Sequence, residues 1–386
     1  MQREAEIAVI RRFLAHLAAG TTQLAPEVLR VPAAEYADRE HHEREIRALF
    51  RRRPLVACLS ADLPREGDFV AVEAGGVPLV LVRQAGGGVR AFANACRHRG
   101  GRLADGRGAL PGGVLRCPFH SWTYAADGRL QAIPLAGEAF AGQDRTRLGL
   151  DERPAAERCG VVLVRAEGRE PVDAEASLHG VAPDLAALDL ARFHHFETRV
   201  TSWRCNWKLA LETFLESYHV FSLHRESVHP WYFSHPMACD AFGPNLRFPV
   251  VRRTLADLAG KPEAEWRLAE HATVQWLVAP NALLTTTRDE LLLWRFASPE
   301  PGRCTAVTSY YSARPPGSEA DRARLARGFE LQLRVTGAED FPMQESVQAG
   351  LDAGVTRELL FGRNEVAAIH FHRALAELLA RAEAPA

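Results

Sequence analysis

The sequence predicts an α+β protein in which a small β domain precedes a larger domain with helices on one face of a curved antiparallel sheet. Two patterns point to this fold class. Short apolar runs separated by glycine-rich turns follow the first 45 residues, and strand-like segments between helical patterns dominate the second half. The length of 386 residues allows two or three domains. We therefore expect a helical segment over 1–45, the β domain over 46–165 and the mixed domain over 166–386.

Two helices and a set of short strands are expected in the first half. Apolar residues recur at helical spacing from Ile10 to Leu17, which predicts an amphipathic helix that ends near Ala19. Helix-forming residues predict a second helix from about Ala33 to Arg52. Glycines at 75–76 and 86–88 then separate apolar runs in the manner of hairpin turns. The expected strands cover 69–72, 77–82, 89–93 and 161–164.

The second half is expected to contain one antiparallel sheet and three helices. Its apolar runs are interrupted by turn signals such as Pro280-Asn281 and Arg288-Asp289. The predicted strands cover 196–203, 273–278, 283–287, 291–296 and 306–311, and the predicted helices cover 205–221, 319–335 and 364–382.

Charge and cysteine content argue against several classes of protein. The net charge of −1 does not suit a nucleic-acid-binding protein, which needs a basic face. No apolar run approaches the roughly 20 residues of a membrane span, and the charged start, with Arg11 and Arg12 in the first apolar stretch, does not resemble a secretory signal. Five of the seven cysteines lie outside any motif and suit buried thiols of a reducing compartment. We therefore expect a cytoplasmic protein.

Two short loops carry a four-ligand metal motif. Cys96 and His98 form a Cys-x-His pair, and Cys117 and His120 form a Cys-x₂-His pair. A [2Fe–2S] centre of the Rieske type has two cysteines on one iron and two histidines on the other. Each loop supplies one ligand of each kind, so the spacing predicts such a centre.

A structural zinc site is the alternative, because Zn²⁺ also binds two cysteines with two histidines. Zinc fingers, however, group like ligands as C-x₂₋₄-C and H-x₃₋₅-H, whereas each loop here mixes the two kinds. Gly100, Gly101 and Pro118 suit tight loops whose backbone N–H groups can point at the sulfurs of a cluster. These features favour iron and sulfur over zinc.

A second metal site is expected between Asn206 and His224. On the predicted helix, Glu216 and His219 lie three residues apart and hence on one face, while His224 reaches the same site only if the helix ends or bends. Two histidines and one carboxylate form the facial triad that holds non-haem Fe(II) and leaves positions open for O₂. Taken alone, two histidines at this spacing are weak support for a metal site.

The two ligand loops and the segment 206–224 together resemble the catalytic α subunits of Rieske non-haem iron oxygenases, and the resemblance covers roughly residues 45–375. It implies a catalytic domain of the helix-grip type, one [2Fe–2S] cluster and one Fe²⁺ per chain, with O₂ as co-substrate. It also implies His219 and His224 as iron ligands.

The resemblance implies a carboxylate ligand far along the chain, and Asp340 is the residue that fits the family pattern. Glu339 is the nearest competitor. Asp340 has a structural alternative, because aspartate favours helix N-caps and Pro342 suits the first turn of a helix.

Glu216 is expected to have a catalytic role as a bridge. In the family, an acidic residue three before the first histidine joins the iron of one subunit to the Rieske domain of its neighbour, which implies an oligomer, most simply a homotrimer. Many relatives have Asp at this position, and an Asn where this chain has Thr213. The alternative for Glu216 is a solvated helix carboxylate.

Several aromatic and apolar residues are expected to line the substrate cavity. Trp231-Tyr232-Phe233 is interpreted as core or pocket wall. His370 and His372 alternate on a helix and therefore are interpreted as packing residues. The remaining expected wall residues are Phe214, Phe221, Leu223, Leu277, Leu284 and Leu293.

We therefore expect a terminal oxygenase that hydroxylates an apolar or aromatic substrate by dihydroxylation, monohydroxylation or oxidative dealkylation. A quaternary ammonium substrate is the alternative, and a non-catalytic Rieske electron carrier or ligand-binding module would belong to another class. No G-x-G-x-x-G fingerprint follows a strand, so no bound NAD or flavin is expected. Electrons would come from a separate NAD(P)H-dependent reductase, directly or through a ferredoxin.

Overall fold

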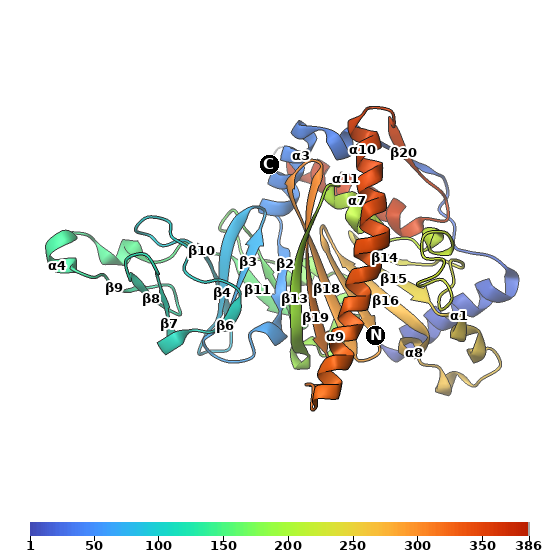
Figure 1. Ribbon diagram of the computed structural model, residues 1–386, viewed down its shortest axis with the longest axis horizontal. Coiled ribbons are helices and arrows are strands. Elements are labelled where there is room, and N and C mark those ends of the chain that lie inside the picture. Colours follow the sequence, from blue (N-terminus) through green and yellow to red (C-terminus); the bar gives the residue numbers. More distant parts are fainter. Residues whose placement is uncertain (385–386) are drawn as a thin grey trace. The chain divides into compact units, whose positions relative to one another are not determined.

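The computed structural model describes residues 1–384 and divides the chain into two compact units (Figure 1). The smaller unit contains residues 50–177 and 189–192, and the larger contains residues 1–49, 178–188 and the chain from 193 onward. The residues of the expected N-terminal segment, 1–45, thus belong to the larger unit. No helix among the described residues is both long and apolar enough to cross a membrane.

The regular structure of the smaller unit consists mainly of short antiparallel strands, as expected for a small β domain. A five-stranded sheet has the order β10-β5-β4-β3-β6, and two three-stranded sheets have the orders β11-β12-β2 and β7-β8-β9. The strands are β2 Leu55–Leu59, β3 Asp68–Ala74, β4 Val77–Arg83, β5 Val89–Ala93, β6 Arg107–Ala109, β7 Val114–Arg116, β8 Thr123–Ala125, β9 Leu130–Ala132, β10 Glu152–Arg153, β11 Ala155–Arg158 and β12 Val161–Val164.

The turn between β3 and β4 shows why glycine is needed there. Gly75 has φ +56°, and a Cβ at this position would lie 2.7 Å from the backbone oxygen of Phe50. A larger residue would therefore be strained by its own backbone and would collide with a neighbouring chain segment.

The larger unit is organised around a seven-stranded antiparallel sheet with the order β13-β19-β18-β17-β16-β15-β14. Its strands are β13 His194–Trp203, β14 Asp240–Phe242, β15 Asn245–Val251, β16 Ala272–Val278, β17 Ala282–Thr287, β18 Glu290–Glu300 and β19 Arg303–Ser312. The four strands predicted between 273 and 311 and the strand predicted over 196–203 are confirmed. Together with the helices, this sheet confirms the expected α+β class.

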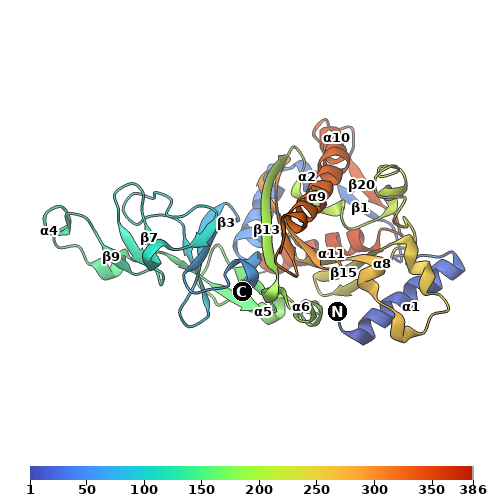
Figure 2. The same cartoon turned by 60° about the horizontal axis from the view of Figure 1, so that its bottom comes forward.

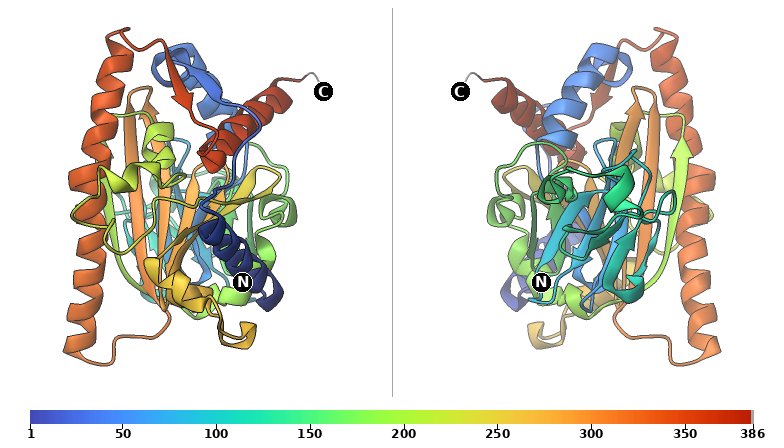
Figure 3. Two further views of the ribbon diagram at one scale, coloured as in Figure 1. Left: turned by 90° about the vertical axis from the view of Figure 1, so that its right-hand side faces the viewer. Right: turned by 90° about the vertical axis from the view of Figure 1, so that its left-hand side faces the viewer.

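Helices accompany this sheet, and Figure 3 shows a long orange-red helical run along one side of it. Helix α9 (Glu319–Val335) continues through a π-helical turn, η9 (Thr336–Asp340), into α10 (Phe341–Asp352). Helix α11 (Val366–Glu383) follows a two-stranded sheet made by β1 (Leu29–Pro32) and β20 (Glu358–Phe361). Figure 2 shows α1 beside the short helix α8 (Leu268–His271), which the contacts between them confirm. The shorter helices α4, α5 and α6 cover Ala136–Ala139, Ala174–Ser177 and Ala182–Leu188.

The first predicted helix is confirmed, but the second is divided. Helix α1 runs from Arg3 to Ala19 and ends at Gly20, which has φ +62°. The predicted helix over 33–52 is instead α2 (Ala34–Ala37), α3 (Arg39–Glu45) and a π-helical segment, η1 (Ile46–Arg51). Asp38 causes the division, because its extended backbone interrupts the helix and its side chain then caps α3 by accepting from the His41 N–H.

The helix predicted over 205–221 is wrong in extent. Helix α7 begins after the cap Asn206 and covers only Trp207–Glu212, and a separate 3-10 helix, η6, covers Tyr218–Phe221. Ser217, between them, has φ −120° and is not helical. The side chain of Glu216 accepts a hydrogen bond from the His219 N–H at 3.1 Å, a local side-chain-to-backbone bond that competes with a continuous helix. The premise that Glu216 and His219 share a helix face was therefore wrong, although the two residues do meet.

Candidate metal centres

Three side chains converge in the larger unit as expected for a mononuclear metal site. His219, His224 and Asp340 each offer one ligand atom, and these atoms all lie within 4.8 Å of one another. The Nε2 atoms of His224 and His219 lie 3.0 Å and 3.5 Å from Asp340 Oδ1. His224 and Asp340 are buried, whereas His219 is partly exposed. His219 is therefore the member of this group that solvent reaches.

Asp340 does not act as a helix cap. Its backbone is helical, with φ −68° and ψ −61°, and its side chain makes no capping hydrogen bond. Its buried Oδ1 atom has no hydrogen bond of good geometry, although it faces the two imidazole nitrogens. A buried acceptor opposite two ring nitrogens is the arrangement that a divalent ion would satisfy, so these residues fit Fe²⁺.

Two further carboxylates contact the other ring nitrogens. Glu339 accepts from His224 Nδ1 at 2.8 Å and from the Ser227 hydroxyl at 2.7 Å. Glu216 makes the equivalent contact with Nδ1 of His219. Each carboxylate therefore fixes its ring with Nε2 directed at Asp340, a pairing that orients metal-ligating histidines in general. Glu339, the competitor for the ligand role, thus contacts the ring atom that faces away from Asp340.

The same carboxylates give this site a negative electrostatic character. Burial lowers the pKa of His224, but the negative charges of Asp340 and Glu339 and the hydrogen bond to Glu339 outweigh burial and raise the pKa. A site that stabilises positive charge on a buried imidazole would also stabilise a bound cation.

The four residues of the cluster motif lie in the smaller unit. Cys96 and Cys117 belong to the hydrophobic core of the loop region, where both are almost fully buried. The rings of His98 and His120 are 4.7 Å apart between centroids. Their Nδ1 atoms are buried and have no hydrogen-bond partner among the residues described. Two buried thiols and two orphaned ring nitrogens fit the ligands of a [2Fe–2S] cluster.

Local hydrogen bonds hold the two ligand loops. The Cys96 N–H donates to the Gly101 carbonyl at 2.8 Å, and the Cys117 N–H donates to the Trp122 carbonyl at 2.8 Å. Gly100 has φ +73°, which closes the first loop in a conformation that glycine adopts freely. A Cβ at Gly101 would lie 3.5 Å from the Cys117 sulfur, so the two loops are in close contact.

Sequence reasoning did not assign roles to two aromatic residues of the second loop. The Trp122 ring stacks on His98 with centroids 5.0 Å apart and an angle of 5° between the planes. The Tyr124 hydroxyl accepts from the Arg97 N–H at 3.0 Å and lies 3.2 Å from the Cys96 sulfur, so its own proton can point at that sulfur. Trp122 and Tyr124 are two residues apart at strand β8, and alternate residues of a strand share a face. This spacing could have indicated that both rings lie on the side of the ligand loops.

A buried ion pair supports the start of the iron-site segment and was also missed. Lys208 and Glu45 are each about 1% exposed, and Lys208 Nζ lies 2.6 Å from Glu45 Oε1. The Trp207 indole donates to the other oxygen of Glu45 at 3.0 Å. Burial raises the pKa of Glu45, but the charge of Lys208 and these hydrogen bonds outweigh it and lower the pKa to about 2.

The expected packing role of His372 is observed, and it involves the same region. The side chain of Glu212, at the end of α7, is 2.9 Å from His372 Nε2 and accepts from the Tyr36 hydroxyl at 2.9 Å. Residues distant in sequence thus hold both ends of a helix of only six residues.

Of the residues expected to line the substrate cavity, Phe214 belongs to a cluster of aromatic rings. Phe214 packs against Trp294 and Phe341, with ring centroids 4.9 Å and 6.4 Å away. Phe341 follows Asp340 in the chain, so one ring of this group is carried by the residue next to the one that faces the two histidines. Trp231 is 69% exposed, so its assignment to core or pocket wall was wrong for the chain by itself. Phe221 is about half exposed.

Comparisons with known proteins agree with this arrangement. A family model described as the ring hydroxylating alpha subunit (catalytic domain) matches residues 190–381, and a Rieske [2Fe-2S] domain model matches residues 53–143. The large subunit of anthranilate 1,2-dioxygenase from Acinetobacter baylyi is 31% identical over 206 residues, covering 51% of this chain and 43% of that protein. The oxygenase subunit of glycine betaine monooxygenase from Pseudomonas aeruginosa is 32% identical over 201 residues, covering 51% of this chain and 45% of that protein.

The match to these curated relatives therefore spans a little under half of their length. Among solved structures, the quaternary ammonium Rieske monooxygenase CntA in complex with an inhibitor has a TM-score of 0.78 at 19% identity, with 92% of this chain and 96% of that chain covered. This likeness shows a common fold. With two family models matched in order along its length, the chain belongs to the Rieske non-haem iron oxygenases as a catalytic α subunit.

Proposed function

We propose that this chain is the terminal oxygenase component of a multicomponent system that hydroxylates an organic substrate with O₂. The convergence of His219, His224 and Asp340 in a chain that also has Rieske loops carries the proposal. A mononuclear Fe(II) at the first site would supply O₂ activation, and a [2Fe–2S] cluster at the second would supply one-electron transfer.

The residues around each site have separate tasks in this proposal. Cys96, His98, Cys117 and His120 hold the cluster, while His219, His224 and Asp340 hold the iron. Glu339 keeps a proton on His224 Nδ1, so that Nε2 is available as a ligand. Glu216 does the same for His219.

We further propose that Glu216 joins His219 to a cluster histidine of a neighbouring copy, in a homotrimer. A carboxylate has two oxygens and several acceptor sites, so it can accept from two imidazole N–H groups at once. Electrons would reach the cluster from a separate NAD(P)H-dependent reductase, directly or through a ferredoxin.

The proposed substrate is an apolar or aromatic compound of modest size. The aromatic group formed by Phe214, Trp294 and Phe341 includes the residue that follows Asp340 in the chain, and its rings carry no fixed charge. Such a wall favours flat or apolar molecules and orients them by shape.

A quaternary ammonium compound is the second candidate, because glycine betaine monooxygenase is among the relatives and aromatic faces also attract such cations. Lys208, the single basic residue between Asn206 and His224, is paired with the buried Glu45 and does not serve a substrate carboxylate. Among quaternary ammonium compounds, this pairing favours an alcohol such as choline over a carboxylate such as glycine betaine.

Iron content and O₂ uptake test the function directly. An oxygenase should contain about three irons per chain, two in the cluster and one at the mononuclear site, whereas an electron carrier would contain about two. With a surrogate reductase and NADH, substrate-dependent O₂ uptake should follow addition of naphthalene or indole. Uptake with choline alone would reverse the order of the two substrate classes, and two irons with no uptake would contradict the oxygenase itself.

A further inference from the structure

Positive charge is concentrated around the cluster loops. Residues 91–150, which include all four cluster residues, contain eight arginines, no lysine and four carboxylates. The whole chain has a net charge of −1, so the remainder carries a net charge of −5. The region that would exchange electrons is therefore basic within a chain that is otherwise acidic, and such a field attracts acidic partners.

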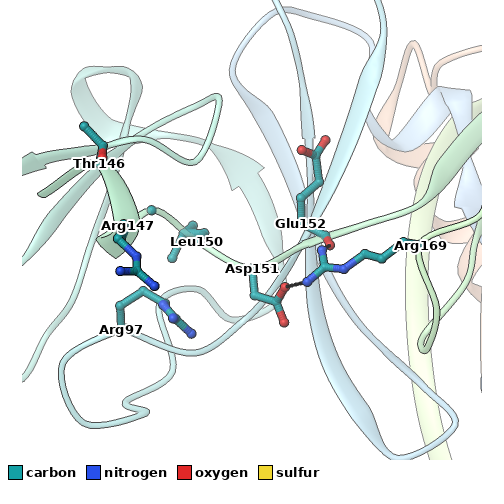
Figure 4. Close-up of a pocket in the computed structure, with 8 residues that line it drawn as sticks. Arg97, Thr146, Arg147, Leu150, Asp151, Glu152 and Arg169 are labelled. Carbon is teal, nitrogen blue, oxygen red and sulfur yellow. Dashed lines mark hydrogen bonds and ion pairs between the residues drawn. The ribbon is translucent and has the colours of Figure 1, made fainter. Parts of the chain in front are cut away.

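Part of this charge surrounds a cavity of about 330 Å³ next to the first ligand loop (Figure 4). Arg97, which lies between the cluster residues Cys96 and His98, lines this cavity together with Arg147 and Arg169. The other lining residues are Thr146, Gly149, Leu150, Asp151 and Glu152.

The carboxylates of the cavity already have partners. Asp151 binds Arg153 at 2.6 Å and Arg169 at 2.6 Å, the latter pair drawn in Figure 4. Glu152 binds Arg90 through two hydrogen bonds, one of 2.7 Å and one of 2.5 Å. These bonds neutralise the carboxylates on one side of the cavity.

The carboxylate nearest in sequence to Arg147 is also engaged. Asp144 accepts from the Thr146 N–H and the Thr146 hydroxyl at 3.0 Å and 2.6 Å, which caps the short helix η4 (Arg145–Leu148). Within the part of the chain that the structure describes, neither Arg97 nor Arg147 forms an ion pair with a carboxylate, and both are exposed. Two unpaired guanidinium groups at one cavity repel each other, and an external anion between them would relieve that repulsion.

We propose that Arg97 and Arg147 form the docking site for carboxylates of an acidic electron-donor protein of the ferredoxin type. This inference rests on the proposed function, because it assumes a cluster at Cys96, His98, Cys117 and His120. The Arg97 N–H donates to the Tyr124 hydroxyl, which contacts the Cys96 sulfur. Arg97 is joined by peptide bonds to the cluster residues Cys96 and His98. A donor bound to Arg97 would therefore lie close to the cluster.

Charge pairing suits an exchangeable donor better than a second copy of this chain. A donor that delivers one electron at a time must bind quickly and leave, and complementary charges raise the association rate while allowing release. Permanent subunit contacts are larger and more apolar. Exposed apolar residues of the same loop region, Phe119 at 58% and Leu135 at 71% exposure, suit such a contact better than the two arginines do.

The test measures how fast the cluster of the full-length holoenzyme is reduced in stopped-flow mixing. Donors are a reduced, negatively charged plant-type [2Fe–2S] ferredoxin and a zwitterionic viologen without net charge. We expect Arg97→Glu and Arg147→Glu to slow reduction by ferredoxin about tenfold or more at low ionic strength, because each places like charges opposite each other. Reduction by the viologen should not change. Arg65→Glu, an exposed charge reversal in the same unit that does not line the cavity, should stay within about twofold of wild type.

The outcomes separate this inference from the proposed function. A wild-type protein without the electron paramagnetic resonance signal of a His-ligated cluster would contradict the proposed function. With that signal present, an Arg147→Glu variant that ferredoxin reduces at the wild-type rate would overturn the docking site, and so would equal slowing with both donors. Arg147 lies outside the ligand loops, so this variant remains informative even where Arg97→Glu fails to assemble a cluster. Dissociation of the oligomer by Arg147→Glu would assign the arginines to a second copy and would also overturn the proposal.

Discussion

The two histidine pairs of this chain are presented in opposite ways. In the larger unit, Nδ1 of His219 and of His224 contacts a carboxylate, and Nε2 faces Asp340. In the smaller unit, Nδ1 of His98 and of His120 is the orphaned atom, and the surroundings are aromatic rings and buried thiols. The difference shows that the neighbours of an imidazole decide which ring nitrogen is free to bind a metal. They also decide how much positive charge on the bound metal the site can stabilise. Carboxylates favour a bare dication, whereas an apolar shell suits a cluster whose charge is neutralised by thiolates.

The largest effect is expected at the cluster site when one of its two cysteine thiols is removed. Cys96→Ser and Cys117→Ser should abolish the electron paramagnetic resonance signal of the reduced cluster, because serine does not replace a thiolate in a Rieske centre. Cys159→Ser, a partly exposed cysteine outside the motif, should keep the full signal. A colourless wild-type protein that contains zinc would contradict the assignment.

The second test removes the shared carboxylate of the other site. Asp340→Ala should lose the mononuclear iron and all substrate-dependent O₂ uptake while the cluster signal remains, because the two sites share no residue. Asp352→Ala at the other end of α10 is the matched control and should retain about three irons per chain. Retention of iron by Asp340→Ala together with its loss in Glu339→Ala would move the ligand by one residue.

A third test addresses what holds the iron-site segment in place. Lys208→Met leaves the buried Glu45 carboxylate without its cation, and we expect a loss of about 3–5 kcal/mol in the free energy of unfolding. Denaturant unfolding measures it. The double variant Glu45→Gln/Lys208→Met should recover most of the loss, and equal destabilisation of both variants would contradict the role of the pair.

The pH dependence of stability follows from the same pair. The pKa of Glu45 is lowered from 4.5 to about 2 on folding. Its contribution is therefore complete above pH 4.5 and is lost as the pH falls toward 2, amounting to about 3 kcal/mol. The double variant should lose less stability than the wild type between these pH values, as urea unfolding would show.

The carboxylates on Nδ1 should have smaller effects than the ligands themselves. Glu339→Gln should weaken iron binding about 10–100-fold, because the neutral amide orients His224 less firmly. Glu216→Gln should keep both metals but slow electron transfer from cluster to iron in a single turnover. Complete loss of iron in Glu339→Gln would instead make Glu339 a ligand.

The smallest expected effect lies at the cluster. Tyr124→Phe removes the hydroxyl beside the Cys96 sulfur, and the loss of one hydrogen bond to a thiolate should lower the reduction potential by about 20–60 mV. Voltammetry of the holoenzyme measures this shift. An unchanged potential would show that the hydroxyl proton does not point at the sulfur.

Sequence reasoning predicted the strands of the large sheet better than it predicted the helix over 205–221. The strand pattern of the large sheet has a period of two and strong turn signals, and the four strands between 273 and 311 appear as expected. The helix over 205–221 was overextended, because helix-forming residues such as Leu215 and Glu216 do not reveal a local hydrogen bond from Glu216 to the His219 N–H.

Other features were invisible because they depend on residues far apart in the chain. The contact of Glu45 with Lys208 joins positions 163 residues apart, and Glu339 meets His224 across 115 residues. Spacing rules describe neighbours on one helix or strand, so they contain no information about such pairs. The same limit explains why the prediction for Trp231 failed: an aromatic residue was expected inside, and its side chain is exposed.

The widened turn that carries Asp340 has a consequence for how the site can change over evolution. A π-helical turn such as Thr336–Asp340 contains one residue more than an α-helix uses for the same rise. Deleting a residue such as Ala338 would restore the tighter turn and rotate the following positions by about 100° around the axis. The identity of the carboxylate that faces the two histidines is therefore fixed by residue count as well as by residue type. A lineage that lost this extra residue would have to recruit a new acidic position, whereas one that kept it would retain Asp340 opposite the two histidines.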